Sequence, residues 1–242
     1  MNRRTATVAD VLHWAAGRLS FVEDEVAGLG TFIRDGDSCL DIGAEYGLYT
    51  WALSARVGPR GQVHSVEPLP GPARWLQLAA RTLGSANVVV HRTALGSRVG
   101  HGTLSLPRRK GLPVHGRAYL TEGAQGPGPN AEFTSSRLVR TRVHTLDQLV
   151  ERAGLEKVAF VKADVEGAEH AVLLGARQTL RRHRPVLLLE IEDRHLAKYG
   201  GRAAEVVAHL GDYGYRPSRW RDGRWTEIGG ISGDCRNYLF TA

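Results

Sequence analysis

The fold of this chain is decided by the stretch Cys39-Leu40-Asp41-Ile42-Gly43-Ala44-Glu45-Tyr46-Gly47. An apolar run ends there in a glycine turn, a helical pattern follows, and a second apolar run at 63–66 is followed by Glu67. The order strand, turn, helix, strand is typical of the first unit of an α/β domain that binds a nucleoside or nucleotide. Glycine lets the backbone approach a ligand closely, and a carboxylate at the next strand tip can accept hydrogen bonds from both ribose hydroxyls.

The spacing of the glycines favours a nucleoside that carries no phosphate. Gly43 and Gly47 are present, whereas the dinucleotide fingerprint uses three glycines to hold a pyrophosphate. S-adenosylmethionine is such a nucleoside, because it has a ribose, an adenine and an amino-acid tail whose ammonium group is attracted to carboxylates such as Asp41. We therefore predict S-adenosylmethionine as the cofactor. The alternative is a glycine turn with a purely structural role.

The size and composition of the chain predict a single soluble domain over residues 1–242. A hydrophobic core stops growing near roughly 250 to 300 residues, so two domains would both be small. No apolar run approaches the ~20 residues of a membrane span, and the residues after Met1 lack the apolar core of a signal peptide. We expect a cytoplasmic protein. The two cysteines, Cys39 and Cys235, predict neither a disulfide framework nor a metal cluster.

The formal net charge of +7 is compatible with an anionic partner. All but four of the 32 basic residues are arginines, and they form only short clusters, at 107–110 and 216–224. The second cluster is interleaved with Trp220 and Trp225, as in a groove that stacks bases. Since both clusters are short and no known nucleic-acid module surrounds them, we do not expect a nucleic acid as the partner.

Hydrophobic periodicity predicts a doubly wound, mostly parallel sheet with helices on both faces. Two N-terminal helices within residues 1–34 are expected to cover one face. The predicted strands are 38–42, 63–66, 87–91, 159–163 and 185–191. The predicted helices between and after them are 48–56, 72–83, 167–183 and 205–210. Residues 213–219 and 237–241 are expected to close the sheet as antiparallel strands.

The α/β pattern is interrupted at 106–136, which is rich in glycine, proline and arginine and has no sustained apolar period. Strand-like residues at 102–106 and 137–144 flank it, so we predict an inserted hairpin arm that forms a lid over the active face. The sequence Thr145-Leu146-Asp147-Gln148 then indicates a capping box at the start of a short helix that ends at Gly154.

Acidic residues follow the predicted strands at their carboxyl ends. Asp164 and Glu166 come directly after the fourth strand, and Glu190 lies at the end of the fifth. Open α/β sheets bind ligands at that edge, where the strand order reverses, so these carboxylates are expected to meet Glu67 in one crevice. We predict that one of Asp164 and Glu166 caps the following helix and that the other contacts cofactor or substrate.

A set of motifs in a fixed order extends this pattern to the C-terminus. They are Leu40-Asp41-Ile42-Gly43-Ala44, Val66-Glu67-Pro68, Thr145-Leu146-Asp147, Lys162-Ala163-Asp164-Val165-Glu166-Gly167-Ala168-Glu169, Leu174-Gly175-Ala176, Pro185 to Glu190 and Asn237-Tyr238. From about Phe32 onwards the chain thereby resembles the FkbM-type methyltransferases, and the Asp-x-Glu-Gly-Ala-Glu block is the most specific part. It departs from the family at Glu45, where Asn or His is usual, and at Thr93-Ala94, where an adenine contact is often found.

The resemblance implies a class I Rossmann-like α/β fold and methyl transfer from S-adenosylmethionine to an oxygen. The implied acceptor is a hydroxyl of a natural product, such as a sugar, nucleoside or polyketide moiety, or of a glycan. The residues expected to bind the cofactor are Asp41, Gly43, Glu45, Tyr46, Gly47, Glu67, Pro68 and Asp164.

An alcohol is a poor acid, so the transfer needs a base that takes the hydroxyl proton. The candidates are Asp164, Glu166, Glu190 and His144. His170 follows Glu166 at helical spacing and is a weaker candidate that is expected to pair with it. A divalent metal held by Asp164 and Glu190 is a further option, which no histidine or cysteine spacing supports.

Three other functions stay open at this point. A nucleic-acid methyltransferase would use the same cofactor core with a basic arm at 108–117. Methylation of a small amine is favoured by the many carboxylates near the strand ends. A non-catalytic module that only binds a nucleoside would keep the same glycines and Glu67. Neither the identity of the acceptor nor the oligomeric state, with a homodimer as one option, can be read from the sequence.

Overall fold

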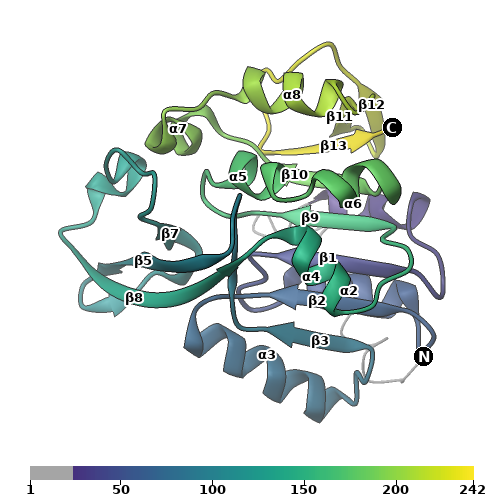
Figure 1. The fold of residues 1–242 in the computed structure, drawn as a ribbon, viewed down its shortest axis with the longest axis horizontal. Coiled ribbons are helices and arrows are strands. Elements are labelled where there is room, and N and C mark those ends of the chain that lie inside the picture. Colours follow the sequence, from purple (N-terminus) through teal and green to yellow (C-terminus); the bar gives the residue numbers. More distant parts are fainter. Residues whose placement is uncertain (1–23) are drawn as a thin grey trace.

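The structure, a computed structural model, describes residues 24–242 as a large sheet flanked by helices, with a smaller sheet at one side (Figure 1). The large sheet has the strand order β12-β11-β13-β10-β9-β1-β2-β3. Its strands are β1 (Ser38–Ile42), β2 (Gln62–Val66), β3 (Val88–His91), β9 (Phe160–Ala163), β10 (Val186–Glu190), β11 (Arg216–Arg221), β12 (Arg224–Glu227) and β13 (Asn237–Thr241). The first five in chain order are parallel and the last three antiparallel. This confirms the predicted sheet, and its strand order reverses between β1 and β9.

Helices cover both faces of the large sheet, because successive residues of its buried strands face opposite sides. They are α2 (Leu48–Val57), α3 (Pro70–Leu83), α4 (Leu146–Arg152), α5 (Glu169–Leu174), α6 (Arg177–Arg182), α7 (Asp193–Leu196) and α8 (Ala203–Gly211), with the 3₁₀ turns η1 (Asp24–Thr31) and η4 (Ala197–Tyr199). Leu40 and Ile42 belong to the core under α4, α5, α6 and α8, whereas Cys39 belongs to the core under η1 and α2. Full burial of each Leu or Ile side chain contributes about 1.5–3 kcal/mol to the stability of the folded state.

One predicted helix, 167–183, is wrong, because α5 and α6 are separate helices that break at Gly175. A Cβ at Gly175 would lie 2.2 Å from the carbonyl oxygen of Gly96, so the backbone packs there too closely for a continuous helix with side chains. Asp147 then caps α6 by accepting hydrogen bonds from the backbone N–H groups of Gln178 and Thr179 at 2.9 and 2.8 Å.

The predicted capping box at α4 is half confirmed. Thr145 Oγ1 accepts a hydrogen bond from the backbone N–H of Gln148 at 3.1 Å, as expected. The Gln148 side chain, however, bonds to the ring of His144 instead of returning to the backbone of Thr145.

The N-terminal cover can be tested only in part. The first of its two predicted helices lies outside the described residues. The second is the 3₁₀ turn η1, which buries Val26 and Leu29 against α2. Within residues 24–242, every helix is too short or too polar to span a bilayer.

The segment between β3 and α4 forms the smaller sheet, in agreement with the predicted hairpin arm (Figure 1). Its long strands β5 (Gly100–Arg109) and β8 (Ser135–His144) pair antiparallel from Gly100 opposite Val143 to Arg108 opposite Ser135. The regular strands therefore continue farther into 106–136 than predicted. The other elements of the arm are β4 (Ala94–Leu95), β6 (Leu112–Pro113), η2 (His115–Arg117), β7 (Tyr119–Leu120) and η3 (Gly128–Glu132).

Candidate active site

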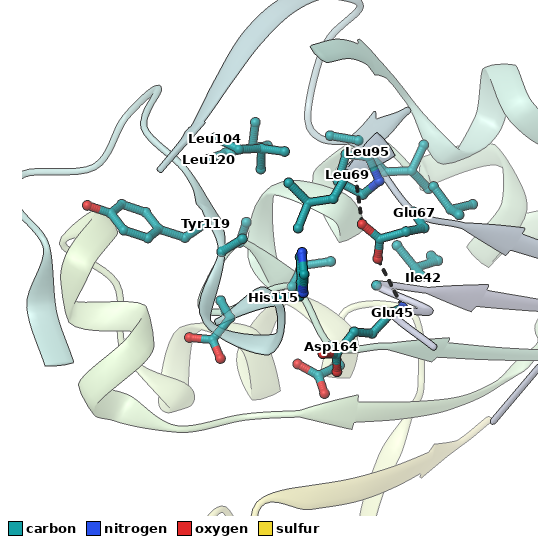
Figure 2. Close-up of a pocket in the computed structure, with 18 of the residues that line it drawn as sticks. Ile42, Glu45, Glu67, Leu69, Leu95, Leu104, His115, Tyr119, Leu120 and Asp164 are labelled. Carbon is teal, nitrogen blue, oxygen red and sulfur yellow. Dashed lines mark hydrogen bonds between the residues drawn. The ribbon is translucent and has the colours of Figure 1, made fainter. Parts of the chain in front are cut away.

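A cavity of about 710 Å³, counted to its open mouth, lies between the carboxyl edge of the large sheet and the arm. Its volume is in the range of small-molecule sites. The sheet edge supplies Ile42, Gly43, Glu45, Val66, Glu67, Pro68, Leu69, Thr93, Ala94, Leu95, Asp164, Val165, Glu166 and Ala168. The arm supplies Leu104, His115, Gly116, Ala118, Tyr119 and Leu120. Figure 2 shows Glu67 and Asp164 from the sheet and His115 and Leu120 from the arm around this common space.

A second, smaller hollow adjoins the cavity and shares Gly43, Glu45 and Asp164 with it. Its remaining lining is Asp41, Ala44, Tyr46, Leu48, Tyr49 and Lys162. The two hollows together bring most of the predicted cofactor residues to one edge of the sheet. Gly47 follows them at the start of α2.

The glycine turn after β1 packs closely against the segment that follows β9. Gly43 has a φ of +79°, and a Cβ there would lie 1.8 Å from the carbonyl oxygen of Asp164. Gly47, with a φ of +92°, has the side chain of Trp51 at 2.6 Å from the position of a Cβ. Glu45 adopts a φ of +44°, which is unusual for a residue with a side chain. The turn is therefore fixed by backbone geometry that other residues would strain.

Glu67 is nearly fully buried and organises the turn around it. Its Oε2 accepts a hydrogen bond from the backbone N–H of Glu45 at 2.9 Å, and its Oε1 accepts one from Leu69 at 2.7 Å (Figure 2). Burial, followed by the nearby Glu45 and Asp41, raises the pKa of Glu67 to about 7, although the two backbone hydrogen bonds oppose this shift. Since each carboxylate oxygen can accept about two hydrogen bonds, one acceptor position remains on each.

Asp41 and Tyr46 lie on the side of the second hollow. Asp41 is buried, and its Oδ2 accepts a hydrogen bond from Thr50 Oγ1 at 2.6 Å. Burial raises the pKa of Asp41 to about 6, against the opposing effects of Thr50 and Lys162. Tyr46 is half-exposed, and its hydroxyl lies 2.9 Å from His115 Nδ1 of the arm. Tyr46 thus connects the glycine turn to the arm.

Asp164 and Glu190 form a pair of neighbouring carboxyl groups at the ends of β9 and β10. Asp164 is partly exposed to the cavity, and its Oδ2 lies 3.9 Å from Lys162 Nζ. Burial and the adjacent Asp164, to which it is hydrogen-bonded, hold the pKa of Glu190 well above its usual range.

Glu166 does not cap the following helix, so that prediction is wrong. Helix α5 begins without a side-chain cap at Ala168. Glu169 Oε1 accepts hydrogen bonds from the backbone N–H groups of Val165 and Gly167, in the turn before the helix, at 2.9 and 3.2 Å. Glu166 adopts a left-handed φ of +58°. Its Oε2 lies 3.4 Å from His195 Nδ1 and 3.5 Å from Lys198 Nζ. Burial raises the pKa of Glu166 to about 7 even with Lys198 beside it.

The two histidines considered as bases do not reach the cavity. His144 Nδ1 lies 2.5 Å from Gln148 Oε1 and 3.2 Å from an Nη of Arg152, at the far end of β8. His170 contacts the ring of His209 at a centroid distance of 5.3 Å. The predicted pairing of His170 with Glu166 is wrong, because α5 begins at Glu169 and Glu166 lies outside the helix.

Three residues beside Glu166 were not found from the sequence: Arg117, His195 and Lys198. Arg117 comes from the arm, with its Nε 4.0 Å from Glu166 Oε1. His195 and Lys198 follow β10 in α7 and η4, and the Lys198 side chain is fully buried. No local pattern marks them. The one available signal was their position just after the carboxyl end of a parallel strand, where ligand contacts concentrate.

This fold is that of the Rossmann-like, S-adenosylmethionine-dependent methyltransferases. The FkbM methyltransferase of Methylobacillus flagellatus KT matches with a TM-score of 0.51 at 16% identity, over 99% of this chain and 59% of that chain. Fibrillarin of Aeropyrum pernix, solved with natively bound S-adenosyl-L-methionine, matches with a TM-score of 0.50 at 17% identity, over 90% and 73% of the two chains.

The family is shown by sequence. The description Methyltransferase FkbM domain applies to a sequence model that matches residues 41–217, a range that contains both the glycine turn and the acidic block. The chain therefore belongs to the FkbM methyltransferase family, which confirms the resemblance drawn from its motifs.

Two relatives are 26% identical to this chain. The 31-O-demethyl-FK506 methyltransferase FkbM of Streptomyces tacrolimicus aligns over 86% of this chain and 85% of its own length. The AMB antimetabolite synthetase AmbE of Pseudomonas aeruginosa aligns over 84% of this chain. The chain spans only 10% of AmbE, as it spans 59% of the Methylobacillus structure.

Proposed function

We propose that this protein transfers the methyl group of S-adenosylmethionine to a hydroxyl oxygen of a small-molecule or glycan acceptor. The observation that carries the proposal is that Glu67 and Asp164 line one cavity, on the two sides of the glycine turn. A ribose acceptor and a proton acceptor are thus both available to a cofactor and a substrate bound side by side. The name of the Streptomyces relative, an O-demethyl-compound methyltransferase, supports an oxygen nucleophile.

The cofactor fits the glycine-turn side of the cavity. The free acceptor positions of Glu67 would receive the two ribose hydroxyls, and the apolar Leu69, Ala94 and Leu95 would flank the adenine. The amino-acid tail would extend past Gly43 towards Asp41 in the second hollow. Thr93 Oγ1 already donates its proton to the backbone oxygens of Ala94 and Arg142, so only its lone pairs are left for an adenine amino group.

The reaction is a direct displacement. The hydroxyl oxygen forms a bond to the methyl carbon while the carbon–sulfur bond breaks, which leaves neutral S-adenosylhomocysteine. The hydroxyl proton passes to Asp164, the carboxylate of the acidic block that is partly exposed to the cavity. Holding the two reactants in line in a closed cavity supplies much of the acceleration, and the proton acceptor adds about 10²–10⁴-fold.

The arm is proposed to act as a lid that completes the acceptor side. Its residues His115, Tyr119 and Leu120 line the cavity opposite the sheet edge. Besides the contacts of His115 with Tyr46 and of Arg117 with Glu166, two hydrogen bonds attach the lid to the body. Tyr199 Oη donates to the carbonyl of Leu120 at 2.7 Å, and the backbone N–H of Gln125 donates to the carbonyl of Lys198 at 2.6 Å. Acceptor specificity is therefore expected to depend on 106–136.

A second candidate is methylation of an amine. Asp164, Glu166 and Glu190 gather at the acceptor end, and a cluster of carboxylates attracts an ammonium group. The two candidates differ in the product, because one contains a methoxyl carbon and the other an N-methyl carbon.

The test uses S-adenosylmethionine with a ¹³C-labelled methyl group, incubated with the protein and extracts of hydroxylated metabolites. Carbon NMR of the labelled product is expected to show a methoxyl signal, and an N-methyl signal would favour the amine.

With the acceptor identified, Asp164→Asn is expected to keep cofactor affinity and thermal stability but to lose about 10²–10⁴-fold in single-turnover rate. The control is Glu151→Gln, an exposed carboxylate on α4. An Asp164→Asn enzyme of normal rate would contradict the role of Asp164.

A further inference from the structure

We propose that Glu166, Glu190 and His195 bind a divalent transition-metal cation beside the cavity, which Glu166 lines. Each of the three residues offers one ligand atom, and these atoms lie within 4.8 Å of one another. They come from three different elements: the turn after β9, the end of β10 and helix α7. The sequence suggested only Asp164 and Glu190 as an alternative pair, because His195 reaches the site through the tertiary fold.

Glu166 is not engaged in strong bonds of its own. The distances from Glu166 Oε2 to His195 Nδ1 and to Lys198 Nζ are 3.4 and 3.5 Å. Charge-assisted hydrogen bonds are shorter, at about 2.7–2.9 Å. Glu166 therefore has lone pairs available on the side of His195.

The imidazole of His195 is an independent indication of a ligand. The residue is 3% exposed, and its Nε2 has no hydrogen-bond partner among residues 24–242. Buried ring nitrogens are normally bonded, so this one is unusual. The other nitrogen, Nδ1, faces Glu166 Oε2 at 3.4 Å. A metal bound at Nε2 would supply the partner that this nitrogen lacks.

The backbone around these residues is tightly packed. Glu166 has a φ of +58° and Gly167 a φ of +105°. A Cβ at Gly167 would lie 2.2 Å from the carbonyl oxygen of His195, so the turn after β9 and helix α7 are in direct backbone contact. This contact fixes Glu166 and His195 relative to each other, as a metal site requires.

Two carboxylates and one imidazole suit Mn²⁺ or a similar first-row divalent ion, whereas Ca²⁺ takes oxygen ligands. The ion would lie beside Asp164, to which Glu190 is hydrogen-bonded. When bound, it supplies a Lewis acid that makes a coordinated hydroxyl more acidic. This catalytic use rests on the proposed function, but the binding of the ion does not.

Lys198 provides a test that a merely structural cluster would not pass. Its ammonium group lies beside Glu166 and 4.5 Å from the ring centroid of Tyr119, and it repels a cation at this place. Lys198→Met keeps the length of the side chain and removes the charge. The affinity for Mn²⁺ is therefore expected to increase in this variant.

The experiment is a titration of the purified protein with Mn²⁺, followed by the six-line electron paramagnetic resonance signal of the free ion. One ion per chain is expected to bind. Glu190→Gln and His195→Gln are expected to weaken binding about tenfold or more, and Lys198→Met to tighten it. The matched control is Glu192→Gln, which removes a carboxylate of the same loop that bonds to Arg194 and should leave the affinity unchanged. Thermal melts establish that each variant is folded.

Absence of binding to the wild-type protein would overturn the proposal. It would also be overturned if a folded Glu190→Gln or His195→Gln variant bound Mn²⁺ as well as the wild type does, because the ion would then lie elsewhere. Since no methyl acceptor is used, these outcomes are separate from a failure of the proposed methyl transfer.

Discussion

The two sides of the cavity are built in different ways. The glycine-turn side, residues 41–47 with Glu67 and Leu69, is held by backbone hydrogen bonds within one β-α-β unit. The carboxylate side, Asp164, Glu166 and Glu190 with their basic neighbours, is held by contacts between side chains that are tens of residues apart. Backbone geometry suits a ligand that never changes, such as a cofactor. Side chains that converge from separate segments suit an acceptor that differs between relatives, because each of them can be replaced independently.

The largest expected effect comes from the junction of the two sides, at Gly43. Gly43→Ala would place a Cβ 1.8 Å from the carbonyl oxygen of Asp164 in a residue with a φ of +79°. The clash and the backbone strain are expected to cost about 3 kcal/mol or more. Urea denaturation measures this loss.

Gly36→Ala is the matched control. Gly36 has a similar φ of +90°, but no atom lies within 4 Å of the position of its Cβ. The Gly36→Ala variant is expected to lose only about 1 kcal/mol in its free energy of unfolding. Equal losses in the two variants would mean that the close contact between the two sides is unimportant for stability.

The second prediction is that a change on the glycine-turn side weakens cofactor binding, whereas a change on the carboxylate side does not. Glu67→Ala removes the carboxylate proposed to hold both ribose hydroxyls, so S-adenosylmethionine binding is expected to weaken about tenfold or more. Glu190→Gln keeps the shape of a side chain that does not line the cavity, and is expected to leave this affinity unchanged. Calorimetry of both variants checks the comparison. An unchanged affinity in Glu67→Ala would remove Glu67 from the cofactor site.

A third, smaller effect concerns the arm. Asn130 is buried; its Nδ2 donates to the carbonyl of Arg117 at 2.7 Å, and its Oδ1 accepts from Arg117 Nε at 3.3 Å. Asn130→Ala is expected to loosen the arm by about 1–3 kcal/mol, seen as faster hydrogen exchange at 112–134 and slower methyl transfer. Cofactor affinity is expected to stay the same. The control is Glu132→Gln, which affects the exposed ion pair with Arg109. It should change neither the hydrogen exchange of the arm nor the rate of methyl transfer.

The smallest effect is a change in the pH dependence of stability. His64 is buried on β2, with its Nδ1 2.9 Å from His91 Nε2 and its Nε2 3.1 Å from Gln62 Oε1. Burial, followed by His91, lowers the pKa of His64 to about 4. The neutral ring is thus favoured in the folded state, and its contribution is fully present above the usual pKa of about 6.5. It is lost as the pH falls from there towards 4.

The measurement is the melting temperature of wild type and His64→Gln at pH 7 and pH 4.5. The wild type is expected to lose more stability than the variant over this interval. The exposed His101→Gln serves as the control and should follow the wild type. Parallel losses in His64→Gln and wild type would show that His64 does not titrate with folding.

The sequence predicted the glycine-turn side well, because its signals are local. An apolar run with a period of two predicts β1, glycines predict the turn, and Glu67 follows the next run. The prediction of one helix over 167–183 failed for the opposite reason. The break at Gly175 depends on a backbone contact with Gly96, which is distant in sequence.

The acidic block, residues 164–169, shows most directly what could not be predicted from the sequence. Its composition predicted that Asp164 or Glu166 caps the following helix and that the other faces the ligand. Instead, Glu169 bonds to the amides of the turn before the helix, and Glu166 turns towards His195 and Lys198. The free-energy difference between two carboxylates that compete for the same amides is small, since a cap contributes only about 1 kcal/mol. Their surroundings therefore decide which one is used.

By itself, the sequence determined the order of most strands and helices, the glycine turn after β1 and the family, because periodicity and glycine spacing act over short stretches of chain. Only the tertiary structure decided which side chains meet at the acceptor end. Arg117, His195 and Lys198 come from the arm and from the segment after β10, and they meet Glu166 because the parallel sheet gathers its carboxyl ends at one edge. Such contacts depend on the packing of whole elements, and no local pattern encodes them.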